Sequence, residues 1–185
     1  MIEMTGAYAG FLNGGRRTIP YGLLELRLAE NNEVLMGADR DEGFQVLNAD
    51  SSGYLVYMLN QVVEQGTGGR AQLADRQVAG KTGTTSAGRD AWFIGFTADY
   101  VTGVWMGYDD NSPLTGVTGG GLPAEIWHEA MTRIEEGLPV RPLPMLVPEI
   151  PEFVPPPVLD PTQPIIAQEE VNAIDKLLND LFGGN

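Results

Sequence analysis

Two runs of β-branched and aromatic residues constrain the fold of this chain more than any other feature. They span 91–97 and 100–108, and only Ala98 and Asp99 separate them. Such runs favour strands, and so short a connection is typical of a tight antiparallel hairpin. A further strand is predicted at 76–84, directly before the pair. The sequence therefore predicts an antiparallel sheet that contains these three strands.

Three amphipathic helices are predicted beside the sheet, at 3–12, 51–65 and 123–136. The first begins without a capping residue. The second is expected to be capped by Asp50 or Ser51 and to end at Gly66. Pro123 suits the first turn of the third helix, and Gly137 is expected to stop it. A smaller hairpin, 21–28 with 34–36, precedes the second helix, so the predicted fold class is α+β, with helices packed against an antiparallel sheet.

The C-terminal part of the chain differs in composition. Ten of the thirteen prolines lie between Leu138 and Pro164, which predicts extended, polyproline-like chain without a core. Apolar residues at 171–181 have the spacing of a short amphipathic helix. The expected organisation is therefore one domain over 1–137, a proline-rich linker over 138–167, and a short helix with the terminus over 168–185.

The composition excludes several classes of function. A net charge of −14 argues against nucleic-acid binding, because the basic surface that neutralises phosphates is missing. The chain has no cysteine, so disulfides, a thiolate nucleophile and cysteine-ligated zinc are excluded. No stretch approaches the roughly 18 apolar residues of a membrane span, and an export signal is not recognisable. Asp99, Asp109 and Asp110 lack the spacing of a calcium loop, so no metal and no cofactor are expected.

Lys81, one of only two lysines, lies among glycines and threonines at 78–85. The run Gly80-Lys81-Thr82 invites comparison with a phosphate-binding P-loop. That motif requires a glycine at position 75, where this chain has Asp75, and it opens a helix, whereas the residues after Lys81 favour extended chain. A nucleotide site is therefore disfavoured.

The alternative is that Lys81, Thr82, Gly83 and Thr84 form a substrate-binding strand. Alternate side chains of a strand face the same way, so the two threonines present hydroxyls to one side and Gly83 leaves the backbone accessible. A substrate can then lie along the strand edge. Two hydroxyls near an ammonium group suit a terminal carboxylate, and a backbone N–H there can face a developing oxyanion.

Lys81-Thr82-Gly83-Thr84 is similar to the third of three motifs of the serine penicillin-recognising enzymes, which also carry Ser-x-x-Lys and Ser-x-Asn. More specifically, residues 4–136 resemble the C-terminal part of the transpeptidase domain of class A, bifunctional penicillin-binding proteins. The similar segments follow the family order and are 3–9 with 13–15, 62–68, 79–85, 89–95, 104–110 and 118–120.

The resemblance implies a peptidoglycan D,D-transpeptidase, in which a serine attacks the D-Ala-D-Ala end of a stem peptide and passes the acyl group to a neighbouring amine. It implies that Lys81 supplies positive potential, that Thr82 and Thr84 bind the substrate carboxylate, and that the Thr84 N–H forms half of the oxyanion hole. β-Lactams mimic the same acyl unit. The implied location is the periplasmic side of the bacterial inner membrane.

The other two motifs are missing from these residues. No serine is followed three positions later by lysine or two positions later by asparagine. The expectation is a C-terminal fragment that is inactive alone, exposes apolar surface, and dimerises or associates with the N-terminal half of the domain. The alternative is a non-catalytic binding module, or a remnant, that kept the carboxylate-recognition strand. A continuous upstream reading frame containing Ser-x-x-Lys favours the fragment, and a stop codon favours the alternative.

Other polar and aromatic residues have structural explanations. His128 is expected to be a surface or packing residue rather than a base, because no serine lies near it in the sequence. Trp92, Trp105 and Trp127 are expected to pack in the core or on the sheet. Arg89 and Asp90 are expected to form an ion pair, either one that shapes the rim of the cleft or a solvated one.

Overall fold

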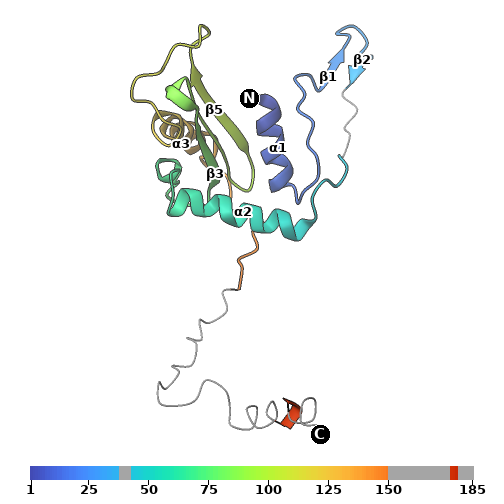
Figure 1. Cartoon of the computed structure of the whole chain (residues 1–185). Coiled ribbons are helices and arrows are strands. Elements are labelled where there is room, and N and C mark those ends of the chain that lie inside the picture. The colour runs from blue at the N-terminus through green and yellow to red at the C-terminus, as the bar shows by residue number, and fades with distance from the viewer. Residues whose placement is uncertain (38–42, 150–175, 179–185) are drawn as a thin grey trace. The chain divides into compact units, whose positions relative to one another are not determined.

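The computed structural model describes residues 1–37, 43–149 and 176–178 (Figure 1). The chain divides into two units, Met1–Pro148 and Glu149–Asn185. The fold described below is that of the first unit. In the second, residues 176–178 are helical, and the rest of the predicted C-terminal helix lies outside the described residues.

A three-stranded antiparallel sheet forms the centre of the first unit. Its strands are β3 (Ala79–Thr84), β4 (Asp90–Phe96) and β5 (Val101–Gly107), in the order β3-β4-β5. Thr82 pairs with Phe93, and Phe93 pairs with Val104. The predicted hairpin and the α+β class are thus confirmed. β3 begins three residues later than expected, because β4 ends at Phe96 and turns at Thr97, leaving residues 76–78 without a partner strand.

Helices cover both faces of this sheet. Side chains alternate along a strand, so Phe93 and Phe96 lie on opposite faces. Phe93 packs with Trp127 of α3 (Leu122–Ile134), whereas Phe96 packs in a second cluster with Phe11 of α1 (Ile2–Leu12) and Val56 of α2 (Ala49–Glu64). Figure 1 shows α3 and α1 on opposite sides of the sheet.

The helix termini lie within two residues of the predicted ones: α2 begins two residues earlier than expected, and α3 ends at Ile134 rather than at 136. The cap expected at Asp50 or Ser51 is wrong, because the Asn48 side chain accepts a hydrogen bond of 2.7 Å from the Ser51 N–H. Asparagine is among the best N-cap residues, and its extended backbone begins the helix earlier. Gly137 follows α3 in a left-handed conformation, as expected of a glycine stop.

The smaller hairpin is present as β1 (Glu25–Arg27) and β2 (Val34–Gly37). Every residue of both strands is exposed, including the apolar residues Leu26, Val34, Leu35 and Met36. The two strands form a separate two-stranded sheet that does not join β3–β5.

Residues 138–148, which we call the C-terminal segment, follow α3 without regular secondary structure and pack against the rest of the first unit. Leu143 is only 5% exposed and joins the cluster that contains Phe96 and Val56. The Leu143 N–H donates to the Gln77 side chain at 3.0 Å, and the Leu146 N–H donates to the Gly53 carbonyl at 3.0 Å. The prediction of chain without a core from Leu138 onward is wrong for this segment, because Leu143 is buried in the cluster around Phe96.

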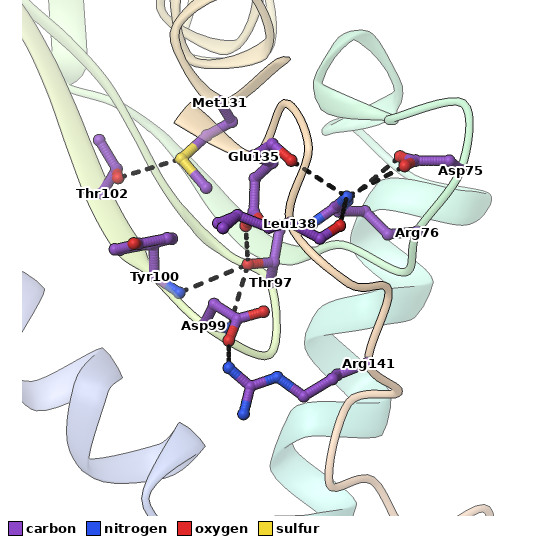
Figure 2. Close-up of polar contacts among 10 residues, drawn as sticks. All are labelled: Asp75, Arg76, Thr97, Asp99, Tyr100, Thr102, Met131, Glu135, Leu138 and Arg141. Atoms are coloured by element: carbon purple, nitrogen blue, oxygen red, sulfur yellow. Dashed lines mark hydrogen bonds and ion pairs between the residues drawn. The ribbon is translucent and has the colours of Figure 1, made fainter. Parts of the chain in front are cut away.

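A buried polar network connects α3, the start of β3 and the turn between β4 and β5 (Figure 2). Arg76 forms an ion pair with Glu135, and their side chains are 5% and 2% exposed. Glu135 also accepts a hydrogen bond from the Thr97 hydroxyl, and Arg76 donates to the Leu138 carbonyl at 3.3 Å. Hydrogen bonding to Asp75, with the charge of Glu135, raises the pKa of Arg76. Arg76 therefore stays charged at neutral pH.

Candidate functional site

β3 has one edge that no other strand covers in the described part of the chain, because it is the outer strand of its sheet. The Thr85 N–H donates to the Asp90 carbonyl across the ladder at 3.0 Å. Backbone groups of alternate residues face the same partner in an antiparallel pair. The N–H groups of Thr82 and Thr84 therefore point to the open edge, where a substrate can reach them.

The two threonine hydroxyls predicted to bind a carboxylate are each held by a different loop. The Thr82 hydroxyl lies 2.7 Å from the hydroxyl of Thr67, which follows α2. The Thr84 hydroxyl accepts a hydrogen bond of 3.0 Å from the Gly119 N–H, in the loop before α3. The two hydroxyls lie on the same side of the strand, as alternation predicts.

Glycines allow these segments to approach one another. A Cβ atom on Gly83 would overlap the Trp92 indole, and one on Gly119 would overlap the backbone of Gly83 and Trp92. A Cβ atom on Gly120 would overlap the Thr67 carbonyl. A larger residue at Gly119 would push its loop away from β3, and one at Gly120 would push the two loops apart.

Lys81 is exposed, and its ammonium group donates to the Thr82 carbonyl at 2.8 Å. Alternation places the root of its side chain on the face opposite Thr82 and Thr84. Among the described residues, Lys81 forms no ion pair. Its positive charge is therefore not neutralised by a carboxylate of the fold, which suits an anionic ligand.

The structure thus places Lys81–Thr84 on one accessible edge and adds Thr67, Gly119 and Gly120 to them. These additional residues were not among the predicted site residues. They lie in the glycine-containing segments 66–68 and 118–120, which the family resemblance included. Their contacts with β3 join residues 15 and 35 positions apart, so no local pattern could reveal them.

Gly80-Lys81-Thr82 lies within β3 and opens no helix, so the structure gives no support to a P-loop.

His128 is half-buried, and its ring forms a hydrogen bond of 2.7 Å with the Gln72 carbonyl. The predicted pair of Arg89 and Asp90 is wrong, because Arg89 donates to the Asn111 carbonyl and Asp90 accepts from Trp105. Trp127 is fully buried, while Trp105 lies exposed on the sheet.

The described residues contain no group of three or more His, Asp or Glu side chains that could hold a metal ion. Within the same residues, no helix is long and apolar enough to cross a membrane.

A groove of about 620 Å³ lies along α1 and is lined in part by Ile2, Gly6, Ile19 and Val46. The groove does not include the residues of the β3 edge.

Comparison with known proteins gives the same match by sequence and by structure. Residues 1–132 match the family model of the penicillin binding protein transpeptidase domain. The chain is 40% identical to penicillin-binding protein 1A of Aquifex aeolicus over 131 residues, which are 70% of this chain and 18% of that protein. It is 33% identical to penicillin-binding protein 1A of Neisseria lactamica over 147 residues, covering 75% of this chain and 18% of that one.

Among solved structures, the penicillin-binding protein PonA1 from Mycobacterium tuberculosis is similar with a TM-score of 0.69 and 27% identity. That match covers 83% of this chain and 45% of the solved one. The chain therefore spans less than a fifth of the length of these curated relatives and less than half of the solved structure.

Proposed function

This chain belongs to the transpeptidase domain family of the penicillin-binding proteins, and from that membership we propose that its β3 edge binds substrate in a peptidoglycan D,D-transpeptidase. The observation that carries the proposal is the arrangement of Thr82 and Thr84. Both hydroxyls are held by loops at the open edge of β3, beside an ammonium group that forms no ion pair with any described residue. This arrangement suits the terminal carboxylate of a stem peptide.

In the proposed reaction, a serine oxygen bonds to the carbonyl carbon of the penultimate D-alanine, and the bond to the last D-alanine breaks. The proton that the serine loses goes to the leaving nitrogen. An amine of a neighbouring stem then bonds to the acyl carbon, the serine ester bond breaks, and the proton that the amine loses returns to the serine oxygen. Thr82 and Thr84 hold the carboxylate, and Lys81 supplies positive potential beside it. The Thr84 N–H, which points to the open edge, donates to the oxyanion that forms at the attacked carbonyl.

These 185 residues supply only part of that reaction. They contain no Ser-x-x-Lys and no Ser-x-Asn, so the nucleophile and its activating lysine must come from other residues. We propose that the N-terminal half of a transpeptidase domain packs along α1. The groove there and the exposed side chains of Ile2 and Met4, 67% and 41% accessible, support such a contact.

The proposed cellular location is the periplasmic side of the bacterial inner membrane, where stem peptides are cross-linked. A β-lactam is proposed to occupy the same edge, because its carboxylate and acyl group resemble those of D-Ala-D-Ala. A binding module without catalysis would use the same residues, and its carboxylate recognition would be identical.

Titration of the chain with acetyl-D-alanyl-D-alanine, followed by nuclear magnetic resonance of the backbone amides, tests the binding proposal. We expect the Thr82, Gly83 and Thr84 signals to move with this acid and to move far less with its C-terminal amide. Lys81→Met should weaken binding of the acid about tenfold, because a charged hydrogen bond is lost.

Lys176→Met, which removes the only other lysine, is the matched control and should leave the affinity unchanged. Equal affinity for the acid and the amide would overturn the carboxylate site. An equal loss in both lysine variants would show that Lys81 acts only through net charge.

A further inference from the structure

Three segments that are distant in the sequence meet at the open edge of β3. The loop 66–68 brings the Thr67 hydroxyl to 2.7 Å from Thr82. The loop 118–120 brings the Gly119 N–H to 3.0 Å from the Thr84 hydroxyl. Gly120 lies against the Thr67 carbonyl, where a Cβ atom has no room. The two loops thus contact each other as well as the strand.

These contacts determine which hydroxyl protons of Thr82 and Thr84 are left to bind a ligand. Each threonine hydroxyl has one proton to donate and two lone pairs that accept. At Thr84 the Gly119 N–H uses a lone pair, and the hydroxyl proton has no acceptor among the described residues. That proton is available to a ligand. Either hydroxyl of the Thr67–Thr82 pair can be the donor. The Thr82 proton is available to a ligand only if the Thr67 hydroxyl donates.

We propose that Thr67 is a positioning residue for the substrate carboxylate, a proposal that rests on the function proposed above. Its hydroxyl donates to the Thr82 oxygen, and the Thr82 proton is thereby directed to the carboxylate. Gly119 does the same for Thr84 through its N–H. The ligand then receives two hydroxyl protons, each from an oxygen that itself accepts a hydrogen bond, and such chains strengthen one another.

The position of Thr67 is set by the fold rather than by its own contact with Thr82. The next residue, Gly68, donates from its N–H to the Val62 carbonyl at 2.9 Å, which closes the end of α2. Gly68 also accepts from the Ala71 N–H at 2.9 Å, at the start of the short 3₁₀ helix Gly69–Ala71. Thr67 itself stays exposed, as a residue that acts beside a bound substrate must be.

The role proposed for Thr67 differs from a general attraction of anions by positive charge. Arg70, the nearest cation in the sequence after Thr67, forms an ion pair with Glu125 at 3.2 Å. Thr67 contributes no charge, so its effect must depend on a directed hydrogen bond. An isosteric residue without a hydroxyl should therefore remove the effect, and serine should restore it.

The test compares Thr67→Val with Thr67→Ser in the full 185-residue chain, using acetyl-D-alanyl-D-alanine and its C-terminal amide as probes in the same resonance titration. We expect Thr67→Val to weaken binding of the acid about two- to tenfold, which is the range for one net hydrogen bond. Binding of the amide should stay unchanged. Thr67→Ser should bind the acid as the unmodified chain does.

Four results would overturn the proposal. Unchanged affinity for the acid in Thr67→Val would show that Thr67 does not direct Thr82. A similar loss for both probes, or a loss that serine does not restore, would show that Thr67 only supports the loop. If the unmodified chain does not prefer the acid, the proposed carboxylate site itself fails, and the positioning role fails with it.

Discussion

Gly83 shows how a single residue governs the candidate site. It pairs with Trp92 across the ladder, and the Trp92 indole occupies the space where a Cβ atom would lie. On the other side, the backbone of Gly83 is in close contact with Gly119. We expect Gly83→Ala to lower the free energy of unfolding by about 1–3 kcal/mol, because it overpacks a filled site. Denaturant unfolding with an unchanged slope measures this.

Gly22→Ala is the matched control for that substitution. A Cβ atom on Gly22 meets nothing within 4 Å, and its backbone is not in the left-handed region. The control should change stability by no more than about 0.5 kcal/mol. If Gly83→Ala is tolerated equally well, the Trp92 ring moves aside freely, and glycine is not required at this position for packing.

At the scale of elements, the Arg76–Glu135 pair joins the end of α3 to the chain that enters β3 (Figure 2). Glu135→Ala would leave the Arg76 guanidinium buried with only Asp75 as a charged partner. We expect a loss of about 2–4 kcal/mol in the free energy of unfolding, since removing one member of a buried pair is costly. Calorimetric or denaturant unfolding provides the measurement.

The exposed pair Arg133–Glu129 on the same helix provides the comparison. Glu129→Ala should cost less than about 1 kcal/mol, as is usual for a solvated pair. The double variant Arg76→Met with Glu135→Leu should recover much of the loss, because no unpaired charge is left inside. A Glu135→Ala variant as stable as Glu129→Ala would show that the buried pair does not hold the elements together.

For the whole molecule, we expect these 185 residues alone to form no covalent adduct with a labelled β-lactam. The reason is chemical, since acylation requires an activated serine and no serine here belongs to Ser-x-x-Lys. Ser52, for example, is buried and donates to the Phe11 carbonyl at 2.7 Å. Gel fluorescence after incubation measures labelling, with an intact penicillin-binding protein as the positive control.

Labelling should appear when a fragment that supplies Ser-x-x-Lys and Ser-x-Asn is added, and the label should then lie on that fragment. A band on this chain alone that unlabelled penicillin competes away would refute the expected inactivity. A complementing fragment that binds the chain but is never labelled would instead favour the binding-module alternative.

Local patterns in the sequence were sufficient for the main elements. The hairpin of β4 and β5 follows from two strand-forming runs with two residues between them, and the common side of Thr82 and Thr84 follows from strand alternation. The family was recognisable because its motif segments occur in order. The start of α2 was missed by two to three residues, because Asn48, Asp50 and Ser51 are all good caps.

The sequence by itself thus determined the strands, most helix boundaries, the family and the identity of the exposed motif residues. Only the tertiary structure decided which loops hold that motif, because Thr67 and Gly119 reach β3 across 15 and 35 residues. It also decided that Leu143 joins the core and that Arg76 pairs with Glu135, across 59 residues. The periodicity of a sequence indicates which residues of one element face the core. Contacts between residues far apart in the sequence depend on how whole elements pack against one another.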